Sequence, residues 1–153
     1  MSTDFAILLL LLAPVCAYAF LKGGKPEQYC ALVIIAGTAF DRLYPWIFGP
    51  RGFHEFSLSR LLTETVLLLV FTSIALRANR NWPLIVAAAQ LVAVAGSFAP
   101  LAVRGGYDQA YWALTQLPLV IQLLALSAGT CLHSLRDARV GPYNDWSPAK
   151  QDC

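Results

Sequence analysis

The chain has 153 residues, of which 58% are hydrophobic and only 13% are charged. A soluble domain carries about 25% charged residues, and a small globule has a large surface to cover with polar groups, so this composition excludes an ordinary soluble domain. The formal net charge of +2 is small, and the basic residues lie at segment ends rather than in one patch, which argues against nucleic-acid binding. We therefore expect an all-α fold, a polytopic membrane helical bundle.

The first apolar run covers residues 4–20. It could be a signal peptide, because its end resembles a small-residue cleavage site. However, the run is preceded by Asp4 and followed by Lys22 and Lys25, which is the reverse of the charge order of a signal peptide. We favour an uncleaved first helix with its N-terminus outside.

Three further spans follow, at about residues 28–48, 57–76 and 82–103. Each is long enough to cross a hydrocarbon core of roughly 30 Å as a helix, which takes about 20 apolar residues. The third and fourth spans form a hairpin around a short basic turn with Arg77 and Arg80. The segment before the second span, from Lys22 to Gln28, reads as a turn.

A fifth span begins near Tyr111 and ends near His133. The sequence thus predicts five transmembrane helices with short loops, a bundle over residues 1–133 and a polar cytoplasmic tail over residues 134–153. The tail contains Gly141, Pro142 and Pro148 and has no helical or strand period. We expect it to be ordered only against the membrane surface or a partner, since it is too short to fold alone.

The distribution of Lys and Arg gives the orientation, because these residues concentrate in cytoplasmic loops. With the N-terminus outside, seven basic residues are inside, namely Lys22, Lys25, Arg77, Arg80, Arg136, Arg139 and Lys150. Three are outside, namely Arg51, Arg60 and Arg104. We therefore expect a multi-pass protein of the bacterial inner (plasma) membrane, with a cytoplasmic C-terminus.

The sharpest candidate site is an intramembrane polar cluster of Asp41, Arg42 and Glu64. Asp41 and Arg42 lie about seven residues before the outer end of the second span, and Glu64 about seven residues after the outer end of the third, so all lie roughly 10 Å below the outer surface. Arg42 and Glu64 could therefore pair. An ionisable residue at this depth suggests function, although a salt bridge that only fixes helix packing, or side chains that snorkel to the interface, would fit as well.

Other residues indicate association between helices or with a partner. In the fifth span Thr115, Pro118, Gln122, Ala125 and Gly129 share one helical face, where small and polar residues allow close approach and hydrogen bonding. Candidate partner-binding residues are this face and the aromatic residues near the span ends: Trp46, Phe53, Tyr107, Trp112, Thr115, Gln122, Tyr143 and Trp146.

Little in the sequence points to catalysis or to a cofactor. The four cysteines form no CxxC pair, and the only two histidines are His54 and His133, so we expect no metal site. No nucleophile triad or phosphate-binding loop is present, and no cofactor is implied. An intramembrane enzyme built on His54, Glu55 and Glu64 is the weakest hypothesis.

Two functional hypotheses remain. The first is an accessory, assembly or stabilising subunit of a larger membrane complex, or a homo-oligomer, because five spans leave almost no extramembrane mass for a catalytic or sensory domain. The alternative is a small transporter or channel that uses Asp41, Arg42 and Glu64 as its polar site. In either case the partners are the lipid bilayer and other membrane subunits or a second copy, and no nucleic acid.

Overall fold

The computed structural model describes residues 3–49, 57–99, 108–141 and 145–146. Over these residues the protein is all-α and has no strand, apart from an isolated bridge between Ala78 and Trp146. The expected all-α class is confirmed. The helices are α1 (Thr3–Lys22), α2 (Lys25–Phe48), α3 (Leu58–Arg77), α4 (Trp82–Gly96) and α6 (Asp108–Val140).

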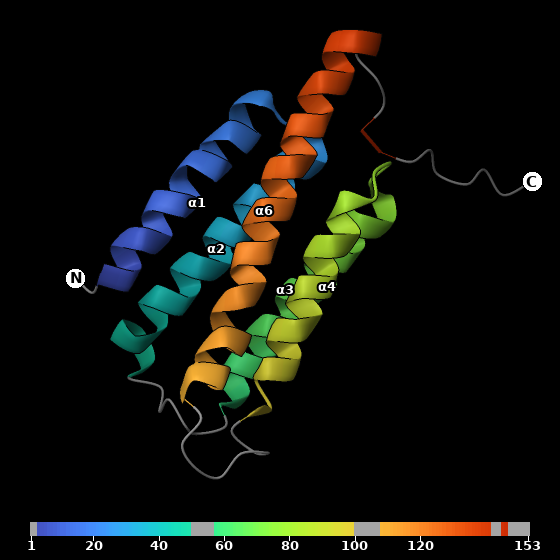
Figure 1. Ribbon diagram of the computed structural model, residues 1–153. Coiled ribbons are helices and arrows are strands. Elements are labelled where there is room, and N and C mark those ends of the chain that lie inside the picture. The colour runs from blue at the N-terminus through green and yellow to red at the C-terminus, as the bar shows by residue number, and fades with distance from the viewer. Residues whose placement is uncertain (1–2, 50–56, 100–107, 142–144, 147–153) are drawn as a thin grey trace, which may run out of the picture.

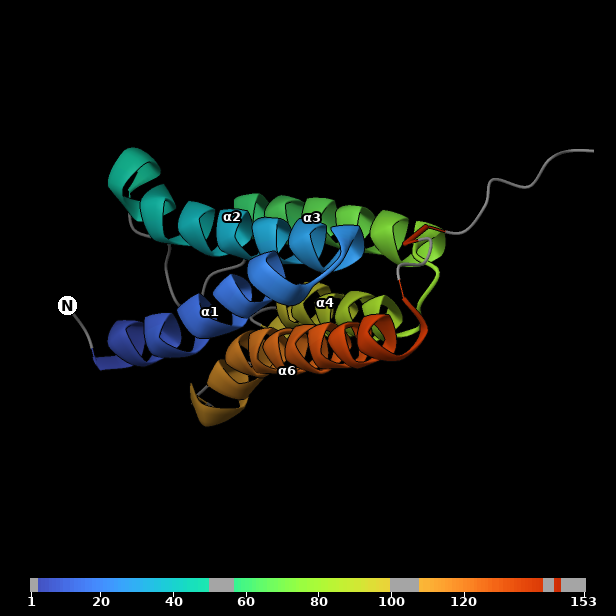
Figure 2. The same ribbon diagram turned by 90° about the horizontal axis from the view of Figure 1, so that it is seen from above.

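The helices run alternately up and down in a bundle (Figure 1). Seen from above, α2 and α3 form one layer, α4 and α6 form the other, and α1 crosses at an angle beside α2 and α6 (Figure 2). Helix α4 packs most extensively, against α3 and α6, whereas α1 contacts α2 and α6. The turn 78–81, the α1–α2 junction and the C-terminal end of α6 consequently share one end of the bundle, which we call the basic end.

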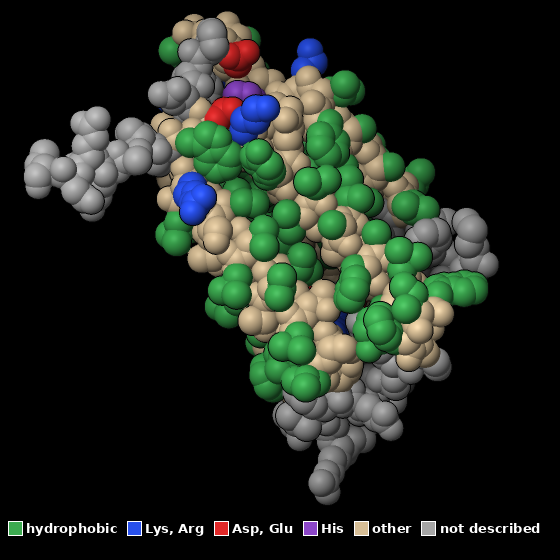
Figure 3. Space-filling model, turned by 180° about the vertical axis from the view of Figure 1, so that it is seen from behind, with side chains coloured by type: hydrophobic (Ala, Val, Ile, Leu, Met, Phe, Trp, Pro, Cys, Tyr) green, Lys and Arg blue, Asp and Glu red, His purple; other side chains and the backbone are tan. Residues whose placement is uncertain are grey.

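Among the described residues, three helical segments are long and apolar enough to cross a membrane: α2, α3 and the part of α6 from Gln116 to Val140. The apolar segments Leu9–Lys22 and Trp82–Gly96 are shorter. Large hydrophobic side chains face outward along the bundle, for example Leu10, Leu69 and Leu124. On the face formed by α2 and α3, hydrophobic side chains cover most of the length and charged groups gather towards the basic end (Figure 3). A membrane-associated protein is the conclusion that these features support.

Two boundaries differ from the sequence-based expectation near the basic end. Lys25–Gln28, expected as part of a turn, forms the first turn of α2. Gly24 caps this helix, Pro26 lies in its first turn and Glu27 follows, and all three residue types are favoured at a helix start. The turn between α1 and α2 is therefore only Gly23 and Gly24.

Helix α6 is 33 residues long and continues beyond His133 to Val140. The first seven residues of the expected tail are thus helical, which the prediction of an irregular tail from residue 134 did not foresee. The helix ends at Gly141, whose φ of +82° is the left-handed conformation that glycine provides at helix C-termini. Pro142 follows and cannot continue the helix.

Helix α4 ends at Gly96 rather than near Val103, with turn residues after it. The packing of α4 on α6 depends on Gly129, where a Cβ atom would lie 2.5 Å from the indole ring of Trp82. Trp82, Val86 and Leu126 form the buried centre of this contact.

Candidate functional site

A cavity of about 280 Å³ lies between α2, α3, α4 and α6. It lies towards the end of the bundle opposite the basic end, since its lining includes Gln90 and Ala93 in the second half of α4 and residues 116–122 in the first half of α6. Its polar lining residues are Thr38, Asp41, Arg42, Arg60, Glu64, Gln90, Gln116 and Gln122. In the space-filling view a basic side chain is visible in a hollow on the lower half of the face formed by α2 and α3 (Figure 3).

Helical periodicity explains why these residues meet. On α2 the lining residues are Val33 and Ile34, Gly37 and Thr38, and Asp41 and Arg42. This spacing of three and four residues keeps them on one helical face. Gly37 brings α3 close, because a Cβ atom there would lie 3.0 Å from Leu67 Cδ1.

The cavity unites the predicted polar cluster. Asp41 and Arg42 on α2 and Glu64 on α3 all line it. Arg60, one turn before Glu64, adds a second guanidinium, with its Nε 4.0 Å from Glu64 Oε1. Direct pairing of Arg42 with Glu64 stays a prediction.

A chain of hydrogen bonds crosses three helices beside these charges. Gln122 Nε2 on α6 donates to Gln90 Oε1 on α4 at 2.7 Å. Gln90 Nε2 in turn donates to Glu64 Oε2 on α3 at 2.6 Å and to the Glu64 carbonyl oxygen at 3.2 Å. All three side chains are buried. The chain ends on a carboxylate oxygen, an acceptor that forms stronger hydrogen bonds when ionised. Gln122 was expected to bond across helices, and it does.

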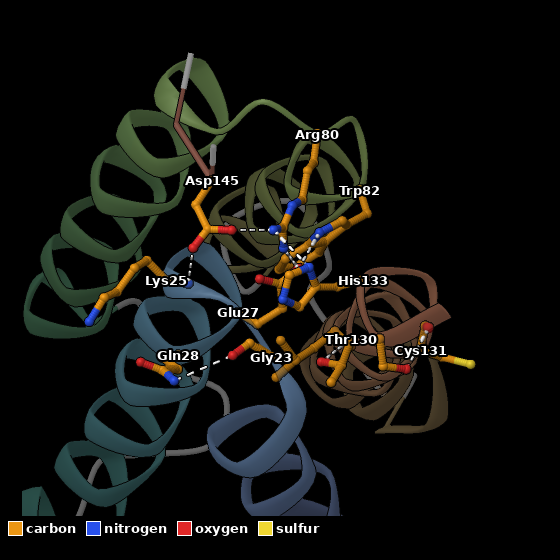
Figure 4. A network of polar contacts seen from close by, with 12 residues as sticks. Gly23, Lys25, Glu27, Gln28, Arg80, Trp82, Thr130, Cys131, His133 and Asp145 are labelled. Carbon is orange, nitrogen blue, oxygen red and sulfur yellow. Dashed lines mark hydrogen bonds and ion pairs between the residues drawn. The ribbon is translucent and has the colours of Figure 1, made fainter. Parts of the chain in front are cut away.

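A second polar cluster lies at the basic end of the bundle (Figure 4). Arg80, in the turn between α3 and α4, forms ion pairs with Glu27 of α2 and with Asp145 after α6. Its Nη2 also lies 3.0 Å from His133 Nδ1, and because a guanidinium has only donors, this ring nitrogen is the acceptor. Trp82 Nε1 donates to Glu27 Oε1 at 3.1 Å. We call these five residues the Arg80 cluster.

Burial makes the Arg80 cluster sensitive to the loss of any one member. The exposed fraction of Glu27 is 0%, and its Oε2 has no hydrogen-bond partner among the described residues. A buried charge is tolerated only when it is paired and hydrogen-bonded. The cluster therefore holds α2, the α3–α4 turn and α6 in one arrangement.

The same cluster fixes part of the C-terminal segment. Asp145 Oδ2 accepts a hydrogen bond from the Lys25 backbone N–H at 2.9 Å, and the Asp145 carbonyl accepts one from Asn79 at 3.2 Å. The ring of Trp146 lies 5.9 Å from that of Tyr29. The expectation that the tail is ordered only by a membrane or partner is wrong for these two residues, because helices of the same chain hold them.

The remaining predicted residues are less informative. Trp46 is 89% exposed at the end of α2, as suits a residue at a membrane interface. Trp112 and Thr115 lie within α6, although the structure does not describe their side chains. Phe53, Tyr107 and Tyr143 lie outside the described residues. Binding of a partner by any of these residues stays a prediction.

Sequence reasoning missed Glu27, Arg80 and Asp145 as members of a site. They are 53 and 65 residues apart along the chain, and no local pattern marks such a contact. The signal that could have revealed Glu27 is the run Gly-Gly-Lys-Pro-Glu, which resembles a helix start more than a turn.

Neither site resembles a metal centre: within the described part of the chain, no group of three or more His, Cys, Asp or Glu side chains could hold a metal ion. Comparison of the chain with protein-family models, curated proteins and solved structures found no match. Proposals about function therefore rest on the geometry of the two polar sites.

Proposed function

We propose that this chain is a five-span integral membrane protein of the transport or solute-binding class, and that the cavity between α2, α3, α4 and α6 holds its solute. The observation that carries the proposal is the set of four ionisable side chains lining one cavity in helices of membrane-spanning character. Charged groups are costly at this depth and mark solute or ion pathways in membrane proteins.

The size and polarity of the cavity favour a small polar solute. Its volume of about 280 Å³ is just below the usual range for small-molecule sites, roughly 300–1,000 Å³. An ion pair whose only role was to hold two helices together would not need a cavity beside it. Here three glutamine side chains, Gln90, Gln116 and Gln122, add both donors and acceptors to the lining.

The five-span topology is part of the same proposal. Helix α1 has 20 residues and α4 has 15, which correspond to about 30 Å and 22 Å at 1.5 Å per residue. A short span is accommodated by local thinning of the bilayer. With the N-terminus outside, the basic end faces the cytoplasm, as the positive-inside rule requires, and the cavity lies in the outer half.

The association hypothesis rests on the small extramembrane mass of the chain. The contacts among the described helices neither require nor fit a particular partner. We therefore rank it second to solute binding.

Thiol labelling in lipid nanodiscs tests the proposal. Thr38 lines the cavity, whereas its neighbour Ala39 is exposed on the outside of α2 at almost the same depth. Cysteine reacts with a maleimide as the thiolate, which needs water. We expect Thr38→Cys to react at least about tenfold faster than Ala39→Cys, with the modified residue assigned by peptide mass spectrometry so that the native cysteines can stay. Equally slow reaction at both positions would overturn the proposal.

A further inference from the structure

The charges of the cavity are balanced on each wall. The α2 wall carries one acid and one base, Asp41 and Arg42, and the α3 wall carries one base and one acid, Arg60 and Glu64. The α4 and α6 walls contribute the amides of Gln90, Gln116 and Gln122 and no charged side chain. The formal charge of the described lining is therefore zero, with both signs present on the two charged walls.

From this balance we propose that the cavity binds a zwitterion, a small molecule or headgroup with an ammonium group and an anionic oxygen group a few atoms apart. This inference rests on the proposed solute-binding function and names its ligand class.

A single-charge ligand fits the cavity poorly. It would give the lining a net charge, and a charge without a counter-charge is costly at membrane depth. An uncharged ligand that came between the acids and the bases would weaken their attraction and supply no charge to replace it. A zwitterion replaces both partners at once, because its anionic group pairs with a guanidinium and its ammonium with a carboxylate.

The hydrogen-bond chain assigns different tasks to the two acids. Glu64 already accepts from Gln90 at 2.6 Å and lies one turn from Arg60. These contacts hold its carboxylate on the α3–α4 side. Asp41 lies across the cavity on α2 beside Arg42. We assign the ammonium group to the carboxylates of Asp41 and Glu64 and the anionic group to Arg42, with the glutamine amides hydrogen-bonding to the linker.

Two sources could supply such a ligand: a free amino-acid-like solute or the headgroup of a zwitterionic lipid. The test measures the midpoint of thermal unfolding of the purified full chain, because a ligand that binds only the folded state raises it. One arm adds β-alanine or glycine betaine at about 10 mM to protein in phosphatidylglycerol nanodiscs, with acetate and methylammonium as matched single-charge probes. The other arm compares phosphatidylethanolamine with phosphatidylglycerol nanodiscs and adds no solute.

We expect a rise of roughly 3 °C or more with a zwitterion in one arm and less than about 1 °C with either single-charge probe. A response to the free zwitterions identifies a solute, and a response only to phosphatidylethanolamine identifies a headgroup. Arg42→Gln should abolish the response in either arm. The matched control Arg139→Gln changes an exposed arginine of α6 outside the cavity and should keep the response.

The outcomes separate the ligand class from the proposed function. Thr38→Cys could react quickly while no zwitterion raises the unfolding midpoint, or while single-charge probes raise it equally. Either result would contradict the zwitterion as the ligand and leave the water-filled cavity standing. If Thr38→Cys reacts as slowly as Ala39→Cys, both fail. Should Arg42→Gln not fold, Asp41→Asn provides the same test from the acidic side, and a response that it retains in full would contradict the assignment.

Discussion

Gln90 of α4 donates a hydrogen bond to the Glu64 carboxylate of α3 at 2.6 Å, deep among apolar helices. Gln122 of α6 supports this contact by donating to Gln90 from the other side at 2.7 Å. One amide thus links three helices and fixes the position of an acidic group at the cavity. The arrangement is more typical of a preorganised binding site than of a single packing contact, because each hydrogen-bonded group restrains the position of the next.

Replacing this amide should destabilise the bundle. Gln90→Leu removes a hydrogen bond from the Glu64 carboxylate and leaves the Gln122 amide without its acceptor, and each lost hydrogen bond of a buried group costs roughly 1–3 kcal/mol. We expect a total loss of about 3 kcal/mol in the free energy of unfolding, measured by detergent titration. Gln116→Leu is the matched control, since Gln116 lines the same cavity but is only half-buried. Equal losses for the two variants would show that the hydrogen-bond chain contributes nothing specific.

Removing Arg80 should be more damaging than removing any exposed arginine. Arg80→Met leaves Glu27 and Asp145 without their ion pairs, and breaking a buried pair on one side costs roughly 3–5 kcal/mol. Arg77→Met, three residues away and exposed, should cost less than about 0.5 kcal/mol. The double variant Arg80→Met with Glu27→Leu should recover part of the loss, because no buried acid then lacks a base. Additive losses in that double variant would contradict the ion pair.

Asp145 should control how the C-terminal segment is held. In Asp145→Asn the hydrogen bonds to Arg80 and Lys25 involve a neutral side chain, and charge-assisted bonds are about twice as strong as neutral ones. Local opening then becomes more populated, so chymotrypsin should cleave after Trp146 roughly tenfold faster. Asp137→Asn on the exposed last turns of α6 is the control. An unchanged cleavage rate in Asp145→Asn would show that the Arg80 cluster does not hold this segment.

Close contact of α4 with α6 predicts a steric effect at one glycine. Gly129→Ala places a Cβ atom 2.5 Å from the buried Trp82 ring, and overpacking of this kind costs about 1–3 kcal/mol. Gly37→Ala should be milder, because its Cβ would meet the movable end of Leu67 at 3.0 Å. Thermal unfolding of both variants measures the difference. If Gly129→Ala were the more stable of the two, the α4–α6 packing described above would be wrong.

The sequence predicted the helices well because hydropathy reports directly on them. All five expected spans contain a helix, and counting residues along helices of fixed rise placed Asp41, Arg42 and Glu64 at one level, in agreement with the cavity that they line together. Hydropathy failed where a helix leaves the apolar region. Ser134–Val140 is polar yet continues α6, and the stop lies at Gly141 and Pro142 rather than at the change in hydropathy.

The sites were only partly predictable. Residues on consecutive helices that line the same cavity, such as Arg42 and Glu64, could be related by counting residues from the span ends. Arg80, Glu27 and Asp145 come from a turn, a helix start and a segment after the last helix. Their contact depends on how the helices are arranged in space, which hydropathy does not encode. Gln122 was assigned to helix packing, and only the structure relates it and Gln90 to Glu64.

Water should enter the cavity from the end of the bundle opposite the Arg80 cluster. Sealed membrane vesicles of known orientation, treated with a membrane-impermeant maleimide, test this most directly with Thr38→Cys. The reagent should modify Thr38→Cys from the outer face at least about tenfold faster than from the cytoplasmic face, and it should not distinguish the two faces at Ala39→Cys. Modification of Thr38→Cys from the cytoplasmic face alone, or from neither face, would contradict the account.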